Sequence, residues 1–421
     1  MRWRRMRWIL PSWRTWSGRR RRGRRGRWMI DGWKLKPLGD LVRIASGQVD
    51  PKDTDVANKF SVGPENLRSG GGLDKLSLRT AGQLEQISGK YEFDKDAILY
   101  SKIRPNLNKI ALVDFDGICS ADMYPIWVRD AQQAVRDFVF YVMNSERFVA
   151  DATSRSFRTG LPKINRPDLE GIEVFIPPVS QQRKIAEILR TWDETIEKLE
   201  VLRALKARRL EAFRDELLFG ARGNARRSAD WPLRRLGDVT CELTTRNNDM
   251  VLARELVMGI TNSRGIVPMR EQTIADDISR YKLLPPRAFA YNPMRINVGS
   301  IAMNGDEQTV LVSPDYVVFA CNAGGIEADY LDHIRQTRWW LHHVNSGGTG
   351  SVRQRTYYDD LAALHLPLPE PNEQAAIIAV LNSAKAEIAA TERMLDVIAR
   401  QKRGLMQKLL TGEWRVKAEA D

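Results

Sequence analysis

The chain has 421 residues, 43% of them hydrophobic, so it is long enough for two or three domains with apolar cores. Its net charge is +13, but residues 1–28 contain 12 Arg and no Asp, Glu or Lys, so the remainder carries 13 less 12, or +1. Any basic surface outside this head must therefore be a local patch. Three widely spaced cysteines without a CxxC motif argue against a disulfide scaffold and for a reducing, cytoplasmic compartment, and no apolar run approaches membrane-spanning length.

Residues 1–32 form an Arg- and Trp-rich tail without a helical or strand period. The tail lacks the apolar core of a secretory signal. It is either a basic arm that contacts phosphates while Trp stacks on bases, or a tail that is disordered or not translated, with Met29 as the true start. The second interpretation is favoured because the internal repeat of the chain begins only at Trp33.

The chain then contains two copies of one module, at residues 33–177 and 231–368. The first copy opens with WKLKPLGD and the second with WPLRRLGD, at an offset of 198 residues. By Tyr124 and Tyr316 the offset has fallen to 192, so the copies share a frame and differ in length by a few residues. The sequence therefore predicts two related domains.

Each copy holds two stretches with the composition of a binding loop. Residues 96–113 and 289–303 each read as two apolar strands joined by a polar turn, and residues 157–165 and 347–358 are Gly-containing loops. Arg, Lys and Asn side chains can read base edges or bind phosphates, whereas the alternative is an ordinary solvated loop. The candidate DNA-binding residues are Lys102, Arg104, Asn106, Asn108, Lys109, Arg158, Lys163, Asn165, Tyr291, Arg295, Asn297, Arg353 and Arg355.

Residues 178–220 and 369–412 are also copies of each other, and each reads as one long helix. The predicted N-caps are Ser180 and Asn372, and the predicted left-handed stops are Gly220 and Gly412. The 39 residues between cap and stop give a helix of ~60 Å at ~1.5 Å per residue.

Apolar residues along these helices recur in alternating steps of four and three, which is typical of a coiled-coil seam. Thr391 and Lys402 are weak points, and the first helix shifts phase through Leu202 and Leu205, like a stutter. The helices either pair with each other or pack separately on their own domains, and the repeat favours pairing because two matched seams can bury each other. The predicted seam residues are Ile185, Leu189, Trp192, Ile196, Leu199, Ile377, Leu381, Ile388, Leu395 and Ile398.

Residues 221–230 are predicted to be a flexible linker and residues 413–421 a polar tail. The chain contains no GxGxxG, GxxxxGK[ST] or HExxH motif and no Asn-Pro-Pro-aromatic tetrapeptide. All four histidines fall in the second copy, so a site built on them would have no counterpart in the first. We therefore predict no catalytic residues, no metal site and no enzymatic activity of the chain by itself.

With these features the chain resembles the DNA-specificity subunit of type I restriction-modification systems over residues 33–412. The runs that carry the resemblance are SKIRPNLNKIA at 101–111, IPPVSQQRKIAEIL at 176–189 and LPLPEPNEQAAIIAVL at 366–381. The family usually shows Glu-Gln after the prolines; the second copy keeps it at Glu373-Gln374, whereas the first has Gln181-Gln182. The Arg- and Trp-rich head is not part of the family pattern.

The resemblance implies an α+β fold, with two duplicated mixed α/β target-recognition domains separated by two long antiparallel coiled-coil helices in a pseudo-two-fold arrangement. Each domain would read one half of a split target in double-stranded DNA, and the helices would space the two halves and dock two modification subunits. Those subunits bind S-adenosylmethionine and methylate adenine, and restriction subunits that use ATP and Mg cut unmodified DNA, so no cofactor is expected on this chain. The alternatives are an orphan DNA-binding or scaffold protein without enzyme partners, and a self-contained methyltransferase or nuclease.

Overall fold

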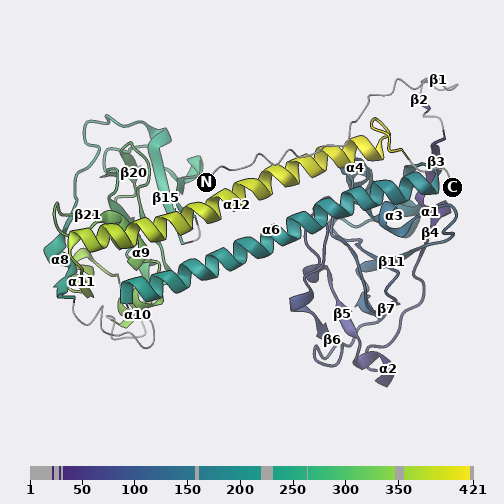
Figure 1. Cartoon of the computed structure of the whole chain (residues 1–421), viewed down its shortest axis with the longest axis horizontal. Coiled ribbons are helices and arrows are strands. Elements are labelled where there is room, and N and C mark those ends of the chain that lie inside the picture. Colours follow the sequence, from purple (N-terminus) through teal and green to yellow (C-terminus); the bar gives the residue numbers. More distant parts are fainter. Residues whose placement is uncertain are drawn as a thin grey trace, which may run out of the picture. The chain divides into compact units, whose positions relative to one another are not determined.

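The structure is a computed structural model that describes residues 32–156, 161–219, 231–262, 264–346 and 355–417, together with the two-residue strands β1 (Arg21–Arg22) and β2 (Trp28–Met29). The chain divides into two compact units, one made of residues 1–198 and 395–421 and the other of residues 199–394. Each unit holds one globular copy of the repeat and parts of both long helices (Figure 1). The interpretations of the Arg- and Trp-rich head, of the linker 221–230 and of the stop at Gly220 lie outside the described residues.

The globular part of the first unit is built on three sheets. The first has the order β4-β11-β8-β9 with antiparallel neighbours, and the second has the order β6-β5-β10-β7, in which β10 is parallel to β5. Strands β3 and β12 form an antiparallel pair. The strands are β3 (Lys34–Pro37), β4 (Val42–Ile44), β5 (Phe60–Val62), β6 (Arg79–Thr80), β7 (Lys90–Phe93), β8 (Ile98–Ser101), β9 (Ile110–Leu112), β10 (Gly117–Ser120), β11 (Met123–Val128) and β12 (Glu173–Ile176).

The second unit repeats this topology strand for strand. Its sheets have the orders β14-β21-β18-β19, β16-β15-β20-β17 and β13-β22, again with one parallel pair, β15 and β20. The duplication predicted from the sequence is therefore a duplication of the fold. The strands are β13 (Leu233–Arg235), β14 (Thr240–Glu242), β15 (Val257–Thr261), β16 (Gly265–Pro268), β17 (Lys282–Leu284), β18 (Phe289–Tyr291), β19 (Ile301–Met303), β20 (Val310–Val312), β21 (Val317–Cys321) and β22 (His365–Pro367).

Short helices connect and cover these strands. In the first unit they are α1 (Leu38–Leu41), α2 (Thr54–Ala57), α3 (Arg136–Met143), α4 (Glu146–Ser154) and α5 (Arg166–Glu170), with the 3₁₀ turns η1 (Pro64–Asn66), η2 (Lys75–Ser77) and η3 (Pro105–Leu107). In the second unit they are α8 (Leu236–Val239), α9 (Ala328–Ile334), α10 (Arg338–Ser346) and α11 (Tyr358–Ala362), with η4 (Arg254–Leu256), η5 (Glu271–Thr273) and η6 (Ile296–Val298).

The predicted hairpins lie at the centre of each globular part. In the first unit, β8 and β9 are joined by η3, and in the second, β18 and β19 are joined by η6, so both hairpins are confirmed. All four residues of β8 and all three of β18 are buried, because each strand has neighbours on both sides and packs on both faces. These rigid strands fix the ends of the polar turns that follow them.

The two long helices are α6 (Val179–Phe219) and α12 (Pro371–Leu410). The predicted N-caps are wrong, because Ser180 and Asn372 are the second residues of their helices. The prolines at the junctions explain the earlier start, since the first turn of a helix has no need of the N–H that proline lacks. The stop at Gly412 is confirmed by its left-handed φ of +70° just beyond the end of α12.

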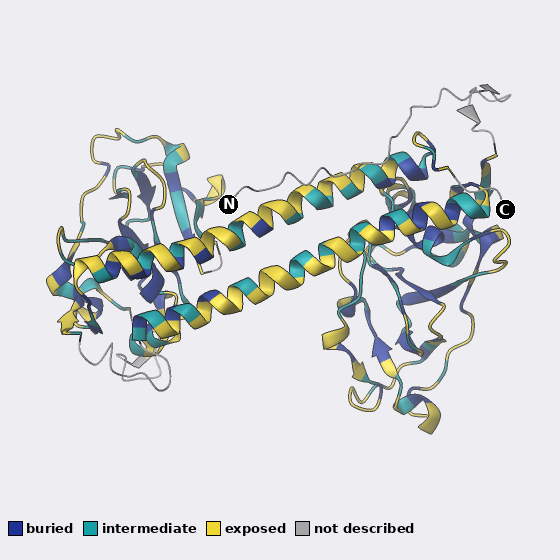
Figure 2. Ribbon diagram, viewed as in Figure 1, coloured by how far each residue is buried: buried dark blue, intermediate teal, exposed yellow. Residues whose placement is uncertain are grey.

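Burial alternates along both helices (Figure 2). None of the ten predicted seam residues is exposed, and in the second unit Arg203 pairs with Glu392 and Arg209 with Glu387, so the helices run antiparallel there. The predicted stutter through Leu202 and Leu205 is wrong, because both side chains are exposed. Charged side chains such as Arg209, rather than leucines, cross to α12 in this stretch.

A glutamine near the start of each long helix ties that helix to its globular part. Gln182 is fully buried; its amide group donates to the carbonyls of Gln133 (2.9 Å) and Pro177 (2.9 Å), and its oxygen accepts from the Val135 amide (2.9 Å). Gln374 makes the matching bonds in the second unit: its amide group donates to the carbonyls of Gly325 and Pro369, and its oxygen accepts from the amide of Glu327.

The residue before each of these glutamines binds the tryptophan that opens the copy. The Trp33 indole donates to Gln181 at 3.2 Å, and the Trp231 indole donates to Glu373 at 3.1 Å. Gln181, which stands where the family usually has Glu, thus keeps the hydrogen bond to the tryptophan. The acceptor is a neutral amide in place of a charged carboxylate.

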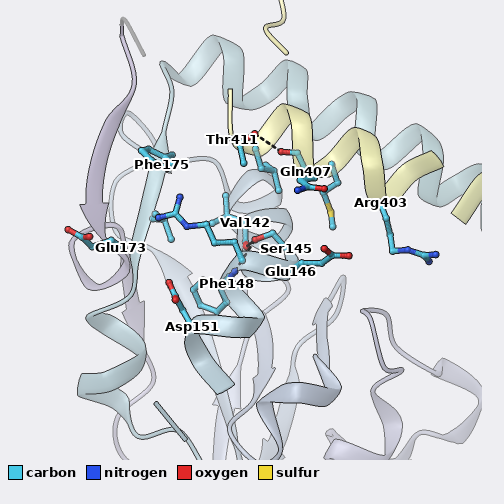
Figure 3. Close-up of a pocket in the computed structure, with 14 residues that line it drawn as sticks. Val142, Ser145, Glu146, Phe148, Asp151, Glu173, Phe175, Arg403, Gln407 and Thr411 are labelled. Atoms are coloured by element: carbon cyan, nitrogen blue, oxygen red, sulfur yellow. Dashed lines mark hydrogen bonds between the residues drawn. The ribbon is translucent and has the colours of Figure 1, made fainter. Parts of the chain in front are cut away.

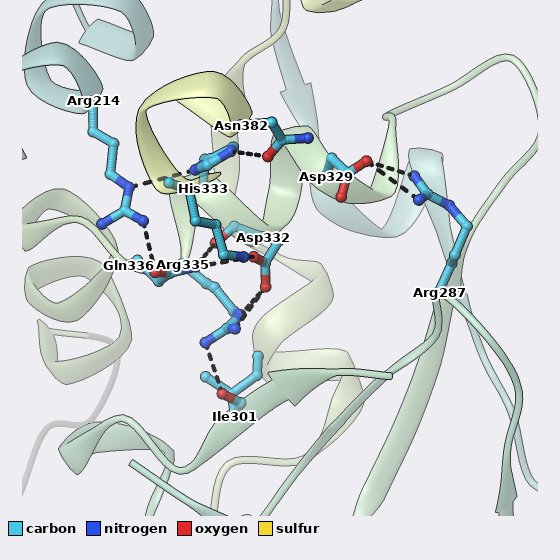
Figure 4. Close-up of polar contacts among 10 residues, drawn as sticks. Arg214, Arg287, Ile301, Asp329, Asp332, His333, Arg335, Gln336 and Asn382 are labelled. Carbon is cyan, nitrogen blue, oxygen red and sulfur yellow. Dashed lines mark hydrogen bonds and ion pairs between the residues drawn. The ribbon is translucent and has the colours of Figure 1, made fainter. Parts of the chain in front are cut away.

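A further polar network joins the second globular part to both helices (Figure 4). His333 on α9 is 1% exposed; its Nδ1 accepts from Arg214 of α6 at 3.4 Å and its Nε2 lies 2.9 Å from Asn382 Oδ1 of α12. Beside it, buried Asp332 pairs with Arg335 at 2.6 Å and with Lys385 of α12 at 3.4 Å. The network therefore holds three elements together.

In the first unit different side chains join the globular part to both long helices. Tyr141, the repeat equivalent of His333, donates to Asp193 of α6 at 2.6 Å, and Asp193 also pairs with Lys402 of α12. Lys402, a weak point of the apolar seam, is thus an ionic contact between the helices. Of these two junctions, only the one in the second unit contains a histidine.

We expect Gln182→Leu to lower the free energy of unfolding by about 2–4 kcal/mol, because it leaves buried backbone groups without hydrogen-bond partners. Gln401→Leu, on an exposed position of α12, is the matched control and should change stability by less than about 0.5 kcal/mol. Urea unfolding followed by circular dichroism measures both. Equal effects of the two changes would contradict the role assigned to Gln182.

The His333 network predicts a pH dependence. Burial, opposed by the bond to Asn382 and reinforced by Arg214, lowers the pKa of His333. The unfolded chain therefore takes up this proton first, so stability is full above about pH 6.5 and falls by up to about 1.4 kcal/mol per pH unit as the pH drops further. His333→Gln should flatten this dependence in calorimetry between pH 5 and 8, while His365→Gln, at an exposed position, should not.

Candidate nucleic-acid interface

The two predicted loops of the first unit lie side by side. The Arg104 amide donates to the Pro162 carbonyl at 2.8 Å, the Ile164 amide donates to the Lys102 carbonyl at 2.9 Å, and Ile103 forms a β-bridge with Lys163. The turn after β8 and the loop before α5, which are some sixty residues apart in the sequence, thus form one surface.

The second unit brings its two loops together in the same way. The Thr356 amide donates to the Pro293 carbonyl at 3.1 Å, and α10, which precedes the second loop, packs against η6. The pairing of a hairpin turn with a later loop is therefore a property of the repeated fold. Different side chains occupy the two copies of this surface.

Six of the candidate residues are exposed there. In the first unit, Arg104 has a left-handed backbone (φ +48°), which is uncommon for a residue with a side chain and aims it away from the regular course of the strand. The exposed candidates are Arg104, Asn106 and Lys163 in the first unit and Arg295, Asn297 and Arg355 in the second. These are the side chains that can reach a nucleic acid without a change of the fold.

Four candidate residues are used by the fold itself. Asn108 donates to the backbone and side-chain oxygens of Asn144, Lys109 donates to the Pro64 carbonyl at 2.5 Å, and Asn165 caps α5 through the Asp168 amide at 2.9 Å. The fourth, Tyr291, is wholly buried in the second core. The prediction is wrong for Tyr291, which is wholly buried, whereas Asn108, Lys109 and Asn165 are half-buried and stay predictions.

Lys102 is a special case among the candidates. Its side chain is only 9% exposed and its ammonium lies 5.1 Å from the centre of the Tyr124 ring. Burial, helped by the neighbouring charge of Lys163 and opposed by Asp122, lowers the pKa of Lys102. Two further predicted residues, Arg158 and Arg353, lie outside the described residues.

Sequence reasoning missed Arg166, which directly follows the predicted Asn165. The Arg166 guanidinium lies 5.9 Å from the centre of the Tyr124 ring. It also treated Tyr124 only as a marker of the repeat. The available signal was the basic residue directly after a predicted loop, but only the sheet brings Arg166, Tyr124 and Lys102 to one place.

A cavity of about 400 Å³ lies elsewhere in the first unit, between α4, β12 and the end of α12 (Figure 3). None of the candidate residues lines it. In the second unit the repeat equivalents of Arg147 and Thr411 are Trp339 and Phe219, whose rings stack at 5.2 Å.

Within the described residues no three His, Cys, Asp or Glu side chains are grouped as a metal site would require. No helix in that part of the chain combines the length and hydropathy needed to cross a membrane.

Residues 30–207 match the family model of the type I restriction modification DNA specificity domain. This stretch is a type I DNA specificity domain. It comprises the first globular part and most of α6, and it confirms the family predicted from the sequence.

Similar proteins support the assignment of the specificity domain. The chain is 36% identical over 171 residues to the type I restriction enzyme EcoDI specificity subunit of Escherichia coli; the match spans 40% of this chain and 37% of that protein. The aligned part is thus little more than a third of the relative's length.

Two solved structures share the fold over nearly the whole chain. The type I restriction-modification S subunit from M. genitalium has a TM-score of 0.55 at 14% identity, covering 90% of this chain and 96% of its own. A chain from a study of complex assembly and conformational transition in a type I R-M system has a TM-score of 0.52 at 17% identity, covering 90% and 98%. The shared fold therefore extends beyond the specificity domain.

We expect Tyr291→Phe to leave DNA affinity unchanged, because the side chain is wholly buried and its hydroxyl has no hydrogen-bond partner within the described residues. Loss of an unpaired buried hydroxyl should leave stability within about 0.5 kcal/mol or raise it slightly. Arg295→Ala, on the exposed turn that follows the same strand, is the comparison. Reduced binding by Tyr291→Phe in a fluorescence anisotropy assay would restore the residue to the interface.

Proposed function

We propose that the chain is the DNA-recognition subunit of a type I restriction-modification system, and that it directs adenine methylation and restriction by partner subunits to a split DNA target. The observation that carries the proposal is that a specificity-domain fold occurs twice in one chain, each time with a polar loop pair at the same position. Two related DNA-reading domains, here called the two readers, suit a target with two separate halves when they lie on one chain.

The two readers would recognise different sequences. The first exposes Arg104, Asn106 and Lys163, and the second exposes Arg295, Asn297 and Arg355. The Arg and Asn side chains among these discriminate bases by about 1–3 kcal/mol for each paired contact, so a few in each copy provide useful specificity. Because the loops differ in sequence and length, the half-sites should differ as well.

The long helices favour a subunit with partners over an orphan DNA-binding protein. In the second unit Val201, Leu202 and Leu205 of α6 and Val380 and Met394 of α12 are exposed large hydrophobic residues. Apolar side chains gathered on exposed helix faces are typical of surfaces that bind another protein. We propose that two modification subunits dock on these helices, which also set the spacing between the half-sites.

In this proposal the chain has no catalytic role. The modification subunits bind S-adenosylmethionine, and the restriction subunits use ATP and Mg. The chain itself contributes base contacts, phosphate contacts and a docking surface.

The first test is co-purification with the proteins encoded next to it. We expect native mass spectrometry to give one copy of this chain with two copies of a larger methyltransferase subunit, and sequencing of methylated adenines to give a two-part target. A chain that purifies alone and still binds a specific duplex would support the orphan protein. A complex that methylates without sequence preference would contradict the proposed function.

Arg104→Ala and Arg295→Ala then test the two-reader arrangement, each serving as the control for the other. We expect Arg104→Ala to lose about 1–3 kcal/mol of discrimination at one or two positions of one half-site, and Arg295→Ala to do so in the other half. The pattern of methylated adenines in cells that express each variant measures this directly. If either change relaxes both halves equally, the two domains do not read separately.

A further inference from the structure

Two basic side chains lie beside Tyr124 of β11 in the first unit, and a third lies close to one of them. Lys102 follows β8 and places its ammonium 5.1 Å from the centre of the ring, and Arg166 opens α5 and places its guanidinium 5.9 Å from the same ring. Lys163, in the loop before α5, is bridged through its backbone to Ile103, the residue after Lys102. Two separate parts of the chain thus bring two cations to the Tyr124 ring and a third, Lys163, close to Lys102.

The carboxylates nearby do not balance these charges. Lys163 lies 3.5 Å from Asp122, and Arg166 donates to the Ala45 carbonyl. The residue Lys102 is 9% exposed, and its ammonium has no hydrogen-bond acceptor within the described residues. Holding this ammonium near a second lysine costs free energy, and binding of an anion would offset that cost.

We propose that Lys102, Lys163 and Arg166 form an anion site that binds a phosphate of the DNA backbone. The proposal rests on the proposed function, since it takes the anion to belong to the recognised duplex. Arg104 is two residues beyond Lys102 and is exposed on the same turn, so a phosphate at this site would fix the register in which Arg104 meets the bases.

The site belongs to one reader only. In the second unit the chain leaves β18 through Asn292 and Pro293, so no cation follows this strand as Lys102 follows β8. The equivalent of Tyr124 is Tyr316, whose carbonyl accepts a hydrogen bond from Lys282 at 2.7 Å. Lys282, which is the repeat equivalent of Lys90 and not of Lys102, therefore has its partner within the protein. The phosphate contact thus distinguishes the first half-site from the second.

The experiment measures the salt dependence of DNA binding by the chain purified with its partner subunits. Variants are Lys102→Met, Lys163→Met and the double variant, in which methionine keeps the apolar stem and removes the charge. Lys198→Met, at an exposed position of α6, is the control for net charge, and Lys163→Arg is the rescue variant. The probes are a duplex with the methylated target and the same duplex with its first half-site replaced, between about 50 and 200 mM salt.

We expect the double variant to bind both duplexes about tenfold more weakly and to reduce the slope of log K against log[salt] by about one, which is the signature of a lost phosphate contact. The preference for the target over the replaced duplex should stay unchanged, and Lys163→Arg should behave as the unmodified chain. Lys163 is exposed, so Lys163→Met tests the site even if Lys102→Met impairs folding.

Two results would overturn the site. An unchanged slope in both single variants would show that no phosphate binds there. A loss confined to the intact first half-site would show that the lysines read bases instead. Failure of the proposed function looks different, because the unmodified complex would then show no preference between the two duplexes.

Discussion

The structure depends on one buried hydrogen-bonded side chain at the start of each long helix. Gln182 and Gln374 each satisfy one carbonyl and one amide of the adjoining globular part and the carbonyl of a proline just before the helix. Because unpaired buried groups are costly, the helix cannot slide or rotate against its domain without losing the two bonds to the globular part. The repeat keeps this constraint in both copies, and it is what allows a rigid helix to fix the position of a recognition loop.

The fold separates what is constant from what varies. The sheet order, the parallel pair and the contact between hairpin turn and later loop are the same in both units. The groups that attach each unit to its helices differ, with Tyr141 and Asp193 in one and His333 and Arg214 in the other. Variation of loop side chains on such a scaffold would change the bases recognised by the proposed DNA-recognition subunit while the long helices stay the same.

Electrostatics here are local, as the net charge of +1 beyond the basic head requires. The fold holds some cations in small groups, such as Lys102 and Arg166 beside Tyr124. Elsewhere arginines and lysines pair with carboxylates between the helices. In the proposed function such a surface would bind a DNA backbone at a few defined phosphates, and specificity would then rest on exposed turns such as the one that contains Arg104.

The sequence by itself determined the duplication, the long helices, both hairpins and the family. Each of these depends on the spacing of apolar residues along the chain or on a run of residues that can be recognised in the sequence. It did not determine which single loop residues are exposed and which are hydrogen-bonded within the fold. Asn108 and Arg104 are equally polar and four positions apart, yet Asn144 holds the first while the second is exposed. Only the tertiary structure decided this, since burial and hydrogen bonding depend on partners that are distant in the chain.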